Sequence, residues 1–112
     1  RSTLFPYTTL FRSLAECDIL PAFGDAMAHV GILGMGVTPL FRCQGIGKRL
    51  IETTLAKARS KEFTRIELRV RTDNDPARIL YEQHGFSIEG TLYRSLRVDG
   101  CYFDAYLMAL LL

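Results

Sequence analysis

Apolar and polar residues alternate strictly over Thr64 to Thr72, and this pattern predicts a half-buried β-strand. The apolar positions Ile66, Leu68 and Val70 fall on one face of that strand. The other face carries charged side chains only, namely Arg65, Glu67, Arg69 and Arg71. One face is therefore expected to lie in a core and the other to meet a polar environment.

A second apolar segment, His29 to Val37, is followed by a helical pattern over Gly47 to Ser60. The apolar side chains of this helix recur at steps of three and four residues, at Ile46, Leu50, Ile51, Thr54, Leu55 and Ala58. Together with the strand Thr64–Thr72, these segments predict a right-handed βαβ unit with parallel strands. Leu14 to Pro21 is expected to form another short strand, with a loop over Ala22 to Ala28.

The last third of the chain predicts a second helix and a hairpin. Asp73-Asn74-Asp75-Pro76 combines an Asx cap with a proline in the first turn, which starts a helix that Gly85 ends. Two strand-like segments, Ile88–Val98 and Cys101–Leu111, are joined by Asp99-Gly100, a strong hairpin signal. The predicted fold class is α/β, more narrowly α+β, with a mixed sheet and the order β-α-β-α-β-β from His29 onward.

Length and composition narrow the class of protein. The 112 residues, of which 48% are hydrophobic and 23% charged, suit one modest globular domain. Cys17, Cys43 and Cys101 show no metal-like spacing, so we expect no metal site and reduced thiols in a cytoplasmic protein. No apolar run approaches the ~18 residues of a membrane span. The net charge of +2 disappears without Arg1 and Arg12, so the chain lacks the concentrated basic composition of nucleic-acid-binding proteins.

Residues 1–13 differ in character from the rest. They nearly repeat themselves, as Thr3-Leu4-Phe5 and then Thr9-Leu10-Phe11. They also resemble the translation of a sequencing-library adapter oligonucleotide. We therefore expect residues 1–13 to be an artefactual segment and residues 14–112 to be a partial domain, although a genuine short strand with a turn at Pro6 is the alternative.

The loop between the apolar segment and the first helix contains the spacing R-x-x-G-x-G, formed by Arg42, Gly45 and Gly47. The first amides of a helix lack internal partners and carry partial positive charge, and glycines let an anion approach the backbone. The P-loop pattern fails because Arg42 stands where it requires a glycine, and the dinucleotide pattern fails because Leu50 stands at its third glycine. The sequence therefore predicts a different kind of phosphate site.

R-x-x-G-x-G between a strand and a helix resembles the pyrophosphate-binding loop of the GCN5-related N-acetyltransferases, which use acetyl-CoA. Asn74 to Phe86 resembles the second signature of the same family, N-x-x-A-x-x-L-Y-x-x-x-G-F. The closing strands resemble those of bacterial members that acetylate small amines such as amino acids. The resemblance covers about residues 29–112.

The resemblance implies a role for several residues. The backbone of Met35, Gly36 and Val37 would pair with the pantetheine arm of the cofactor, and Asn74 would contact that arm. Arg42 would open the phosphate motif. The amides that hold the pyrophosphate would be those of Cys43, Gln44, Gly45, Ile46, Gly47 and Lys48. Tyr81 would be the general acid that protonates the departing thiolate.

Each assignment has a structural alternative. Tyr81 lies on the apolar face of its helix and is also suited to a core, and Asn74 is also suited to a helix cap. Glu67 is a candidate for the general base or for orienting a water, or it is a surface residue. Some relatives carry an acid where this chain has Arg69. His84 is expected to pack at a helix end.

The function expected from these residues is acetyl-CoA-dependent transfer of an acetyl group to a primary amine. The expected partners are a small-molecule or peptide amine, without nucleic acid or membrane, and homodimer formation stays open. A non-catalytic CoA-binding or interaction fragment is the alternative, because the segments that commonly shape the amine site in this family are not recognised here. A nucleotide-binding module based on Lys48, Arg49, Arg69 and Arg71 is disfavoured by the balanced charge.

Overall fold

The computed structural model describes residues 15–37 and 46–112. Its elements are β1 (Ala15–Pro21), η1 (Asp25–Met27), β2 (Val30–Val37), α2 (Ile46–Ser60), β3 (Arg65–Arg71), α3 (Asp75–Gln83), β4 (Ser87–Val98) and β5 (Cys101–Leu111). The predicted strands and helices are confirmed to within a residue or two at their ends. The predicted loop at Ala22–Ala28 contains the short 3₁₀ helix η1.

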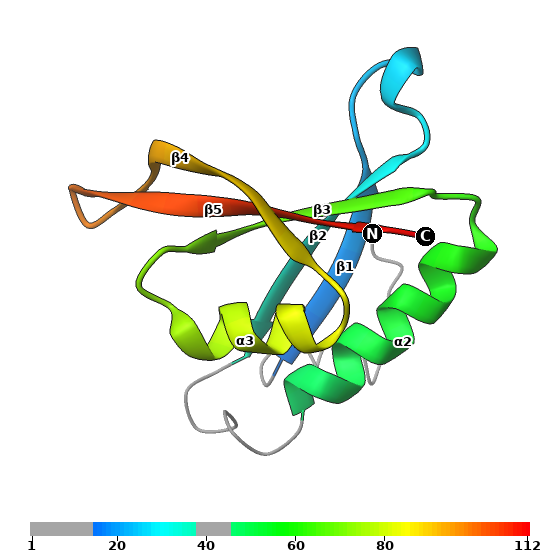
Figure 1. The fold of residues 1–112 in the computed structure, drawn as a ribbon, viewed down its shortest axis with the longest axis horizontal. Helices are drawn as coiled ribbons and strands as arrows, with labels where there is room; N and C mark the ends of the chain where they lie inside the picture. Colours follow the sequence, from blue (N-terminus) through cyan, green and yellow to red (C-terminus); the bar gives the residue numbers. More distant parts are fainter. Residues whose placement is uncertain (1–14, 38–45) are drawn as a thin grey trace.

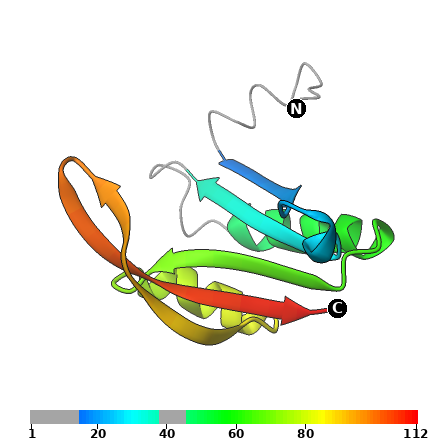
Figure 2. The ribbon, with the colours of Figure 1, turned by 90° about the horizontal axis from the view of Figure 1, so that it is seen from above.

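The five strands form one mixed sheet in the order β1-β2-β3-β5-β4. Neighbouring strands are antiparallel except for β2 and β3, which are parallel as the βαβ prediction requires. Both helices cover the same face of this sheet (Figure 1). The view from above shows both helices behind the strands, so the described part of the chain leaves the second face of the sheet uncovered (Figure 2).

The core lies between the sheet and the two helices. β3 contributes Ile66, Leu68 and Val70, which are buried, and α2 contributes its inward residues Ile51, Leu55 and Ala58. Met108 of β5 and Phe86 complete the centre of this cluster. The alternation in β3 and the three- and four-residue spacing in α2 thus identified the core face of each element, because burial follows the repeat of the backbone.

Glycine at position 31 has a packing reason. A Cβ atom at Gly31 would lie 2.5 Å from Cγ2 of Ile19 and 3.1 Å from Cδ1 of Ile66, closer than ordinary van der Waals contact. By contrast, a Cβ at Gly34 would meet no atom within 4 Å. The close packing of Ile19 and Ile66 against β2 therefore requires glycine at position 31, whereas position 34 has room for a side chain.

The chain reverses as predicted at both turns. Asp99 and Gly100 have φ angles of 51° and 78°, the left-handed pair that a two-residue hairpin needs. Gly85 has φ 95° at the end of α3, and Phe86 there donates its backbone N–H to the carbonyl of Tyr81 at 3.1 Å. Phe86 thus returns the chain into the core.

Candidate functional site

The parallel strands β2 and β3 part within the sheet. Their residues pair at Val30–Arg65, Gly31–Ile66 and Ile32–Glu67, and the pairing stops there. β2 continues to Val37, still paired with β1, and β3 continues to Arg71, still paired with β5. Two strand edges therefore diverge with backbone groups that neither strand satisfies for the other, and Figure 2 shows this divergence.

Such an opening suits an extended ligand. Backbone N–H and C=O groups at a strand edge pair readily with an added strand or a strand-like molecule. Met35, Gly36 and Val37, which the family resemblance assigned to the pantetheine arm, all lie on the open part of β2. The structure describes their backbone, and that is the part of these residues that the assignment requires.

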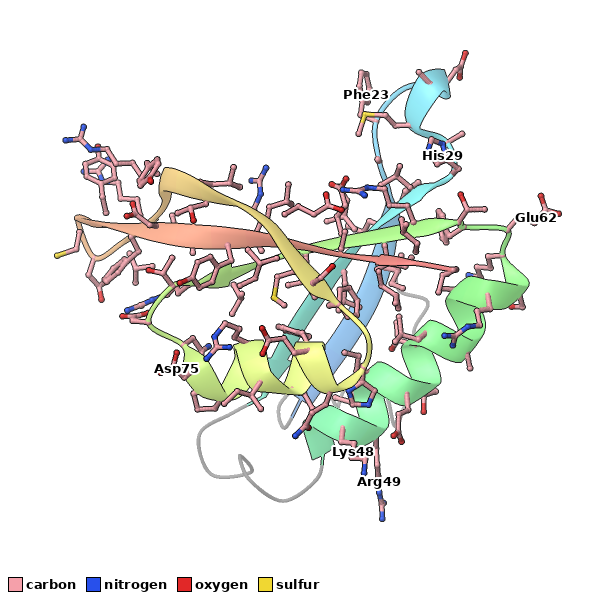
Figure 3. All side chains as sticks on the ribbon, in the orientation of Figure 1. Phe23, His29, Lys48, Arg49, Glu62 and Asp75 are labelled. Atoms are coloured by element: carbon pink, nitrogen blue, oxygen red, sulfur yellow. The ribbon has the colours of Figure 1, made fainter. Side chains whose placement is uncertain are left out.

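The structure describes only the end of the predicted phosphate loop. Arg42, Cys43, Gln44 and Gly45 lie outside the described residues, so their assignments stay predictions. Ile46, Gly47 and Lys48 form the first turn of α2, and that turn contains no acidic residue. Lys48 and Arg49 extend from this end of the helix (Figure 3) and are exposed. The helix dipole and two cations make this terminus positive, which favours a bound anion.

Tyr81 is the buried residue of α3, and its side chain ends in a hydroxyl group. It is 6% exposed and belongs to the same core cluster as Leu33, Leu68 and Val70, which flank the place where β2 and β3 part. The Phe86 ring contacts it edge to face, with centroids 5.8 Å apart. The location suits both interpretations of Tyr81, as a core residue and as an acid near the diverging strands.

Asn74 caps α3. Its side-chain oxygen accepts a hydrogen bond from the backbone N–H of Ala77 at 3.3 Å, and Pro76 lies in the first turn. Its own backbone N–H donates to the carbonyl of Arg71 at 3.0 Å, at the end of β3. The capping interpretation is therefore confirmed. Asn74 lies just beyond the end of β3, the strand with the open edge.

Glu67 belongs to an ionic cluster on the uncovered face of the sheet. Its Oε2 accepts a hydrogen bond from Nε of Arg65 at 2.8 Å, while the two terminal nitrogens of Arg65 bind both oxygens of Glu89 at 2.5 and 3.1 Å. The Arg65 guanidinium lowers the pKa of Glu89, and its hydrogen bonds to Glu89 and then Glu67 raise the pKa of Arg65. Glu67 is thus oriented rather than free to rotate, and it stands at the last parallel pair before the strands part.

The histidines take structural positions. His84 at the end of α3 is half-buried, with Nδ1 2.9 Å from the carbonyl oxygen of Leu80 and Nε2 3.5 Å from Glu52. The expected packing at a helix end is therefore confirmed. The backbone carbonyl of His29 accepts hydrogen bonds from Thr64 and Arg65, which joins the starts of β2 and β3.

Sequence reasoning missed the contacts that cross the sheet. Arg65 and Glu89 are 24 residues apart, and no local pattern pairs them. The bulge in β4 between Leu92 and Leu96 was also missed, and there Arg94 has φ 53° and donates its N–H to Oδ1 of Asp104. The only hint of these contacts in the sequence was the alternating charged positions of β3. They indicated a polar face but did not show which residues of other strands it contacts.

Two absences apply to the described residues. Among residues 15–37 and 46–112, no cluster of three or more His, Cys, Asp or Glu side chains has the arrangement of a metal site. Over the same residues, neither helix has the length and apolar character needed to cross a membrane.

The sequence matches a family model described as the acetyltransferase (GNAT) family over residues 14–86. N-alpha-acetyltransferase RimI of Mycobacterium tuberculosis is 43% identical over 74 residues, covering 66% of this chain and 44% of that protein. L-amino acid N-acetyltransferase AaaT of Escherichia coli is 35% identical over 83 residues, covering 73% of this chain and 51% of that protein. The chain thus spans about half the length of these curated relatives.

Solved structures share the fold. A GNAT-family acetyltransferase from Streptococcus pneumoniae superposes with a TM-score of 0.82 at 31% identity, covering 88% of this chain and 60% of that one. YncA of Salmonella typhimurium, solved with its cofactor acetyl-CoA, gives a TM-score of 0.81 at 16% identity, covering 88% of this chain and 57% of that one. At 16% identity, the similarity to YncA is evidence of a shared fold alone.

Proposed function

The chain belongs to the GNAT acetyltransferase family, and from that membership we propose that it is the cofactor-binding part of an acetyl-CoA-dependent N-acetyltransferase that acts on a primary amine. The observation that carries the proposal is the end of β2–β3 pairing after Ile32 and Glu67, with the start of α2 following β2 in the chain. An open strand edge and a positive helix terminus fit the two polar parts of acetyl-CoA, its amide-bearing arm and its pyrophosphate.

The residues present fit this cofactor. The backbone of Met35, Gly36 and Val37 would hold the arm by strand-like hydrogen bonds, and Asn74 would approach it from the end of β3. The pyrophosphate would lie on the amides of residues 43–48, with Arg42 at the start of the motif. Bound there, acetyl-CoA supplies an acetyl thioester whose carbonyl carbon an amine can attack.

The proposed reaction is a direct transfer. The amine nitrogen forms a bond to the acetyl carbon, the carbon–sulfur bond breaks, and the thiolate leaves with the bonding electrons. Tyr81 donates a proton to that thiolate, whose ordinary pKa of about 8.5 makes protonation favourable at neutral pH. Glu67, directly or through a water, accepts the proton that the amine loses. Holding the two reactants together supplies a large share of the rate.

Two measurements test the proposal in sequence. Isothermal titration calorimetry with CoA and acetyl-CoA tests cofactor binding, and mass spectrometry of amine mixtures tests transfer. Mass spectrometry is preferable to a thiol reagent because Cys101 is an exposed free thiol that would react. Absence of CoA binding by the folded chain contradicts the proposal, and binding without any acetylated product favours the alternative of a non-catalytic CoA-binding fragment.

A further inference from the structure

Arg69 differs from the other two arginines of β3 and from Arg78 of α3. Arg65, Arg71 and Arg78 each bind a carboxylate of a neighbouring residue. Among the residues that the structure describes, Arg69 makes no ion pair, although charged residues, Glu67 and Arg71, stand two positions before and after it on the same strand. It is exposed, while the residues before and after it, Leu68 and Val70, are buried. An exposed guanidinium without an ionic partner is available to bind a ligand.

The position of Arg69 relates it to the opening between the strands. It lies two residues beyond Glu67, on the part of β3 that no longer pairs with β2. Side chains two apart on a strand share a face, so Glu67 and Arg69 lie side by side on the uncovered face, about 7 Å apart along β3. The uncovered face thus offers a carboxylate and a guanidinium in succession, beginning where the strands part.

This face is the one from which an acceptor would approach. α2 packs on the opposite face, so phosphates bound at its first turn lie on the helix side of the sheet. Under the proposed function, a cofactor arm that ran from there between β2 and β3 would bring its reactive end toward the uncovered face. An amine at that end would lie on the face of the sheet that carries Glu67 and Arg69.

We propose that Arg69 binds the carboxylate of the acceptor and that the acceptor is an α-amino acid or a similar amino carboxylate. The proposal rests on the proposed N-acetyltransferase function and names its substrate class. A guanidinium and a carboxylate form two parallel charge-assisted hydrogen bonds, a geometry that a lysine cannot reproduce. Glu67 attracts the ammonium group of the free amino acid, and its Oε1 is left for that contact because Arg65 occupies Oε2. The pair therefore complements a zwitterion.

The experiment compares matched acceptors on the wild-type chain. Each of several amino acids is offered with its carboxamide, which keeps the amine and the side chain but removes the negative charge. We expect kcat/KM to favour the acid by about 10- to 100-fold, the range expected for one charge-assisted pair. In Arg69→Gln the preference should fall to within about threefold, with the loss mainly in KM for the acid, and Arg69→Lys should restore part of it.

Arg97→Gln is the control, since Arg97 is another exposed arginine, in the distal part of β4 and outside the proposed site. It should keep the wild-type preference. Equal use of acids and carboxamides by the wild type overturns the proposal, as does an unchanged preference in Arg69→Gln. Transfer to neither acceptor, with or without CoA binding, would count instead against the N-acetyltransferase function.

Discussion

The two edges of β3 show how one strand serves both structure and chemistry. On one side β3 pairs with β5 over its whole length, from Arg65–Leu111 to Arg71–Ala105. On the other side it pairs with β2 for only the first three residues. Every residue of β3 has a partner on β5, whereas only the first three have one on β2, so the parallel edge leaves backbone groups without a strand partner. Pairing with β5 therefore holds β3 in the sheet, even where its other edge is not paired with β2.

The largest effect is expected from Tyr81→Phe, in the core beneath the open edge of β3. Loss of the hydroxyl removes the proposed proton donor and should lower kcat about 10²- to 10⁴-fold, the usual contribution of general acid catalysis. The aromatic ring and its edge contact with Phe86 remain, so CoA affinity measured by calorimetry should change little.

Tyr93→Phe is the matched control for this substitution, because Tyr93 is 78% exposed on β4 and should leave turnover unchanged. An unaltered kcat across the pH range in Tyr81→Phe would show that another group protonates the thiolate.

The next largest effect is a difference in stability between substitutions in the two parts of β2, the part that pairs with β3 and the part that does not. Gly31→Ala places a methyl group against Ile19 and Ile66, and overpacking of this kind costs about 1–3 kcal/mol. Gly34→Ala places its methyl group in open space, so the free energy of unfolding should be unchanged or slightly raised. Urea denaturation of both variants measures the difference, and equal destabilisation would refute the packing explanation for Gly31.

A smaller effect is expected on the antiparallel side, at the bulge of β4. Asp104→Ala removes the acceptor for the N–H of Arg94 and should destabilise the chain by about 1 kcal/mol. Asp104→Asn keeps an oxygen in place and should lose less. Arg94→Gly relieves the positive φ and should offset part of the loss in a double variant, as thermal unfolding of the three proteins would show.

The smallest effect is a pH dependence of stability that involves the pair Arg65–Glu89. Arg65 lowers the pKa of Glu89 in the folded chain below its ordinary value of 4.5. A lowered folded pKa means that the stabilisation is present above the unfolded pKa and is lost as the pH falls through the folded one. The melting temperature of wild type should exceed that of Glu89→Gln at pH 7, and the gap should close as the pH drops below about 4.5.

High salt provides the check on this last prediction. Because both side chains reach solvent, 1 M sodium chloride should narrow the gap at pH 7. A gap that is the same at pH 3 and pH 7 would mean that the substitution acts through packing rather than charge.

Local patterns were sufficient for the elements and for their inward faces. The alternation over β3, the spacing in α2, the cap at Asn74 and the turn at Asp99-Gly100 each depend on residues a few positions apart. The motif at Asn74–Phe86 was also local, and it led to the correct family. The role of Glu67 was left open, because its partner Arg65 is also bound to Glu89, which comes from a different strand.

By itself the sequence determined the strands, helices, turns and family of this protein, since these follow from backbone periodicity, capping and short motifs. Only the tertiary structure decided where β2 leaves β3, which residues the opening separates, and which charges remain without a partner on the uncovered face. Strand pairing and ion pairing depend on distances between segments that lie far apart along the chain. The contrast between the satisfied arginines and Arg69 could therefore appear only once the sheet had brought them together.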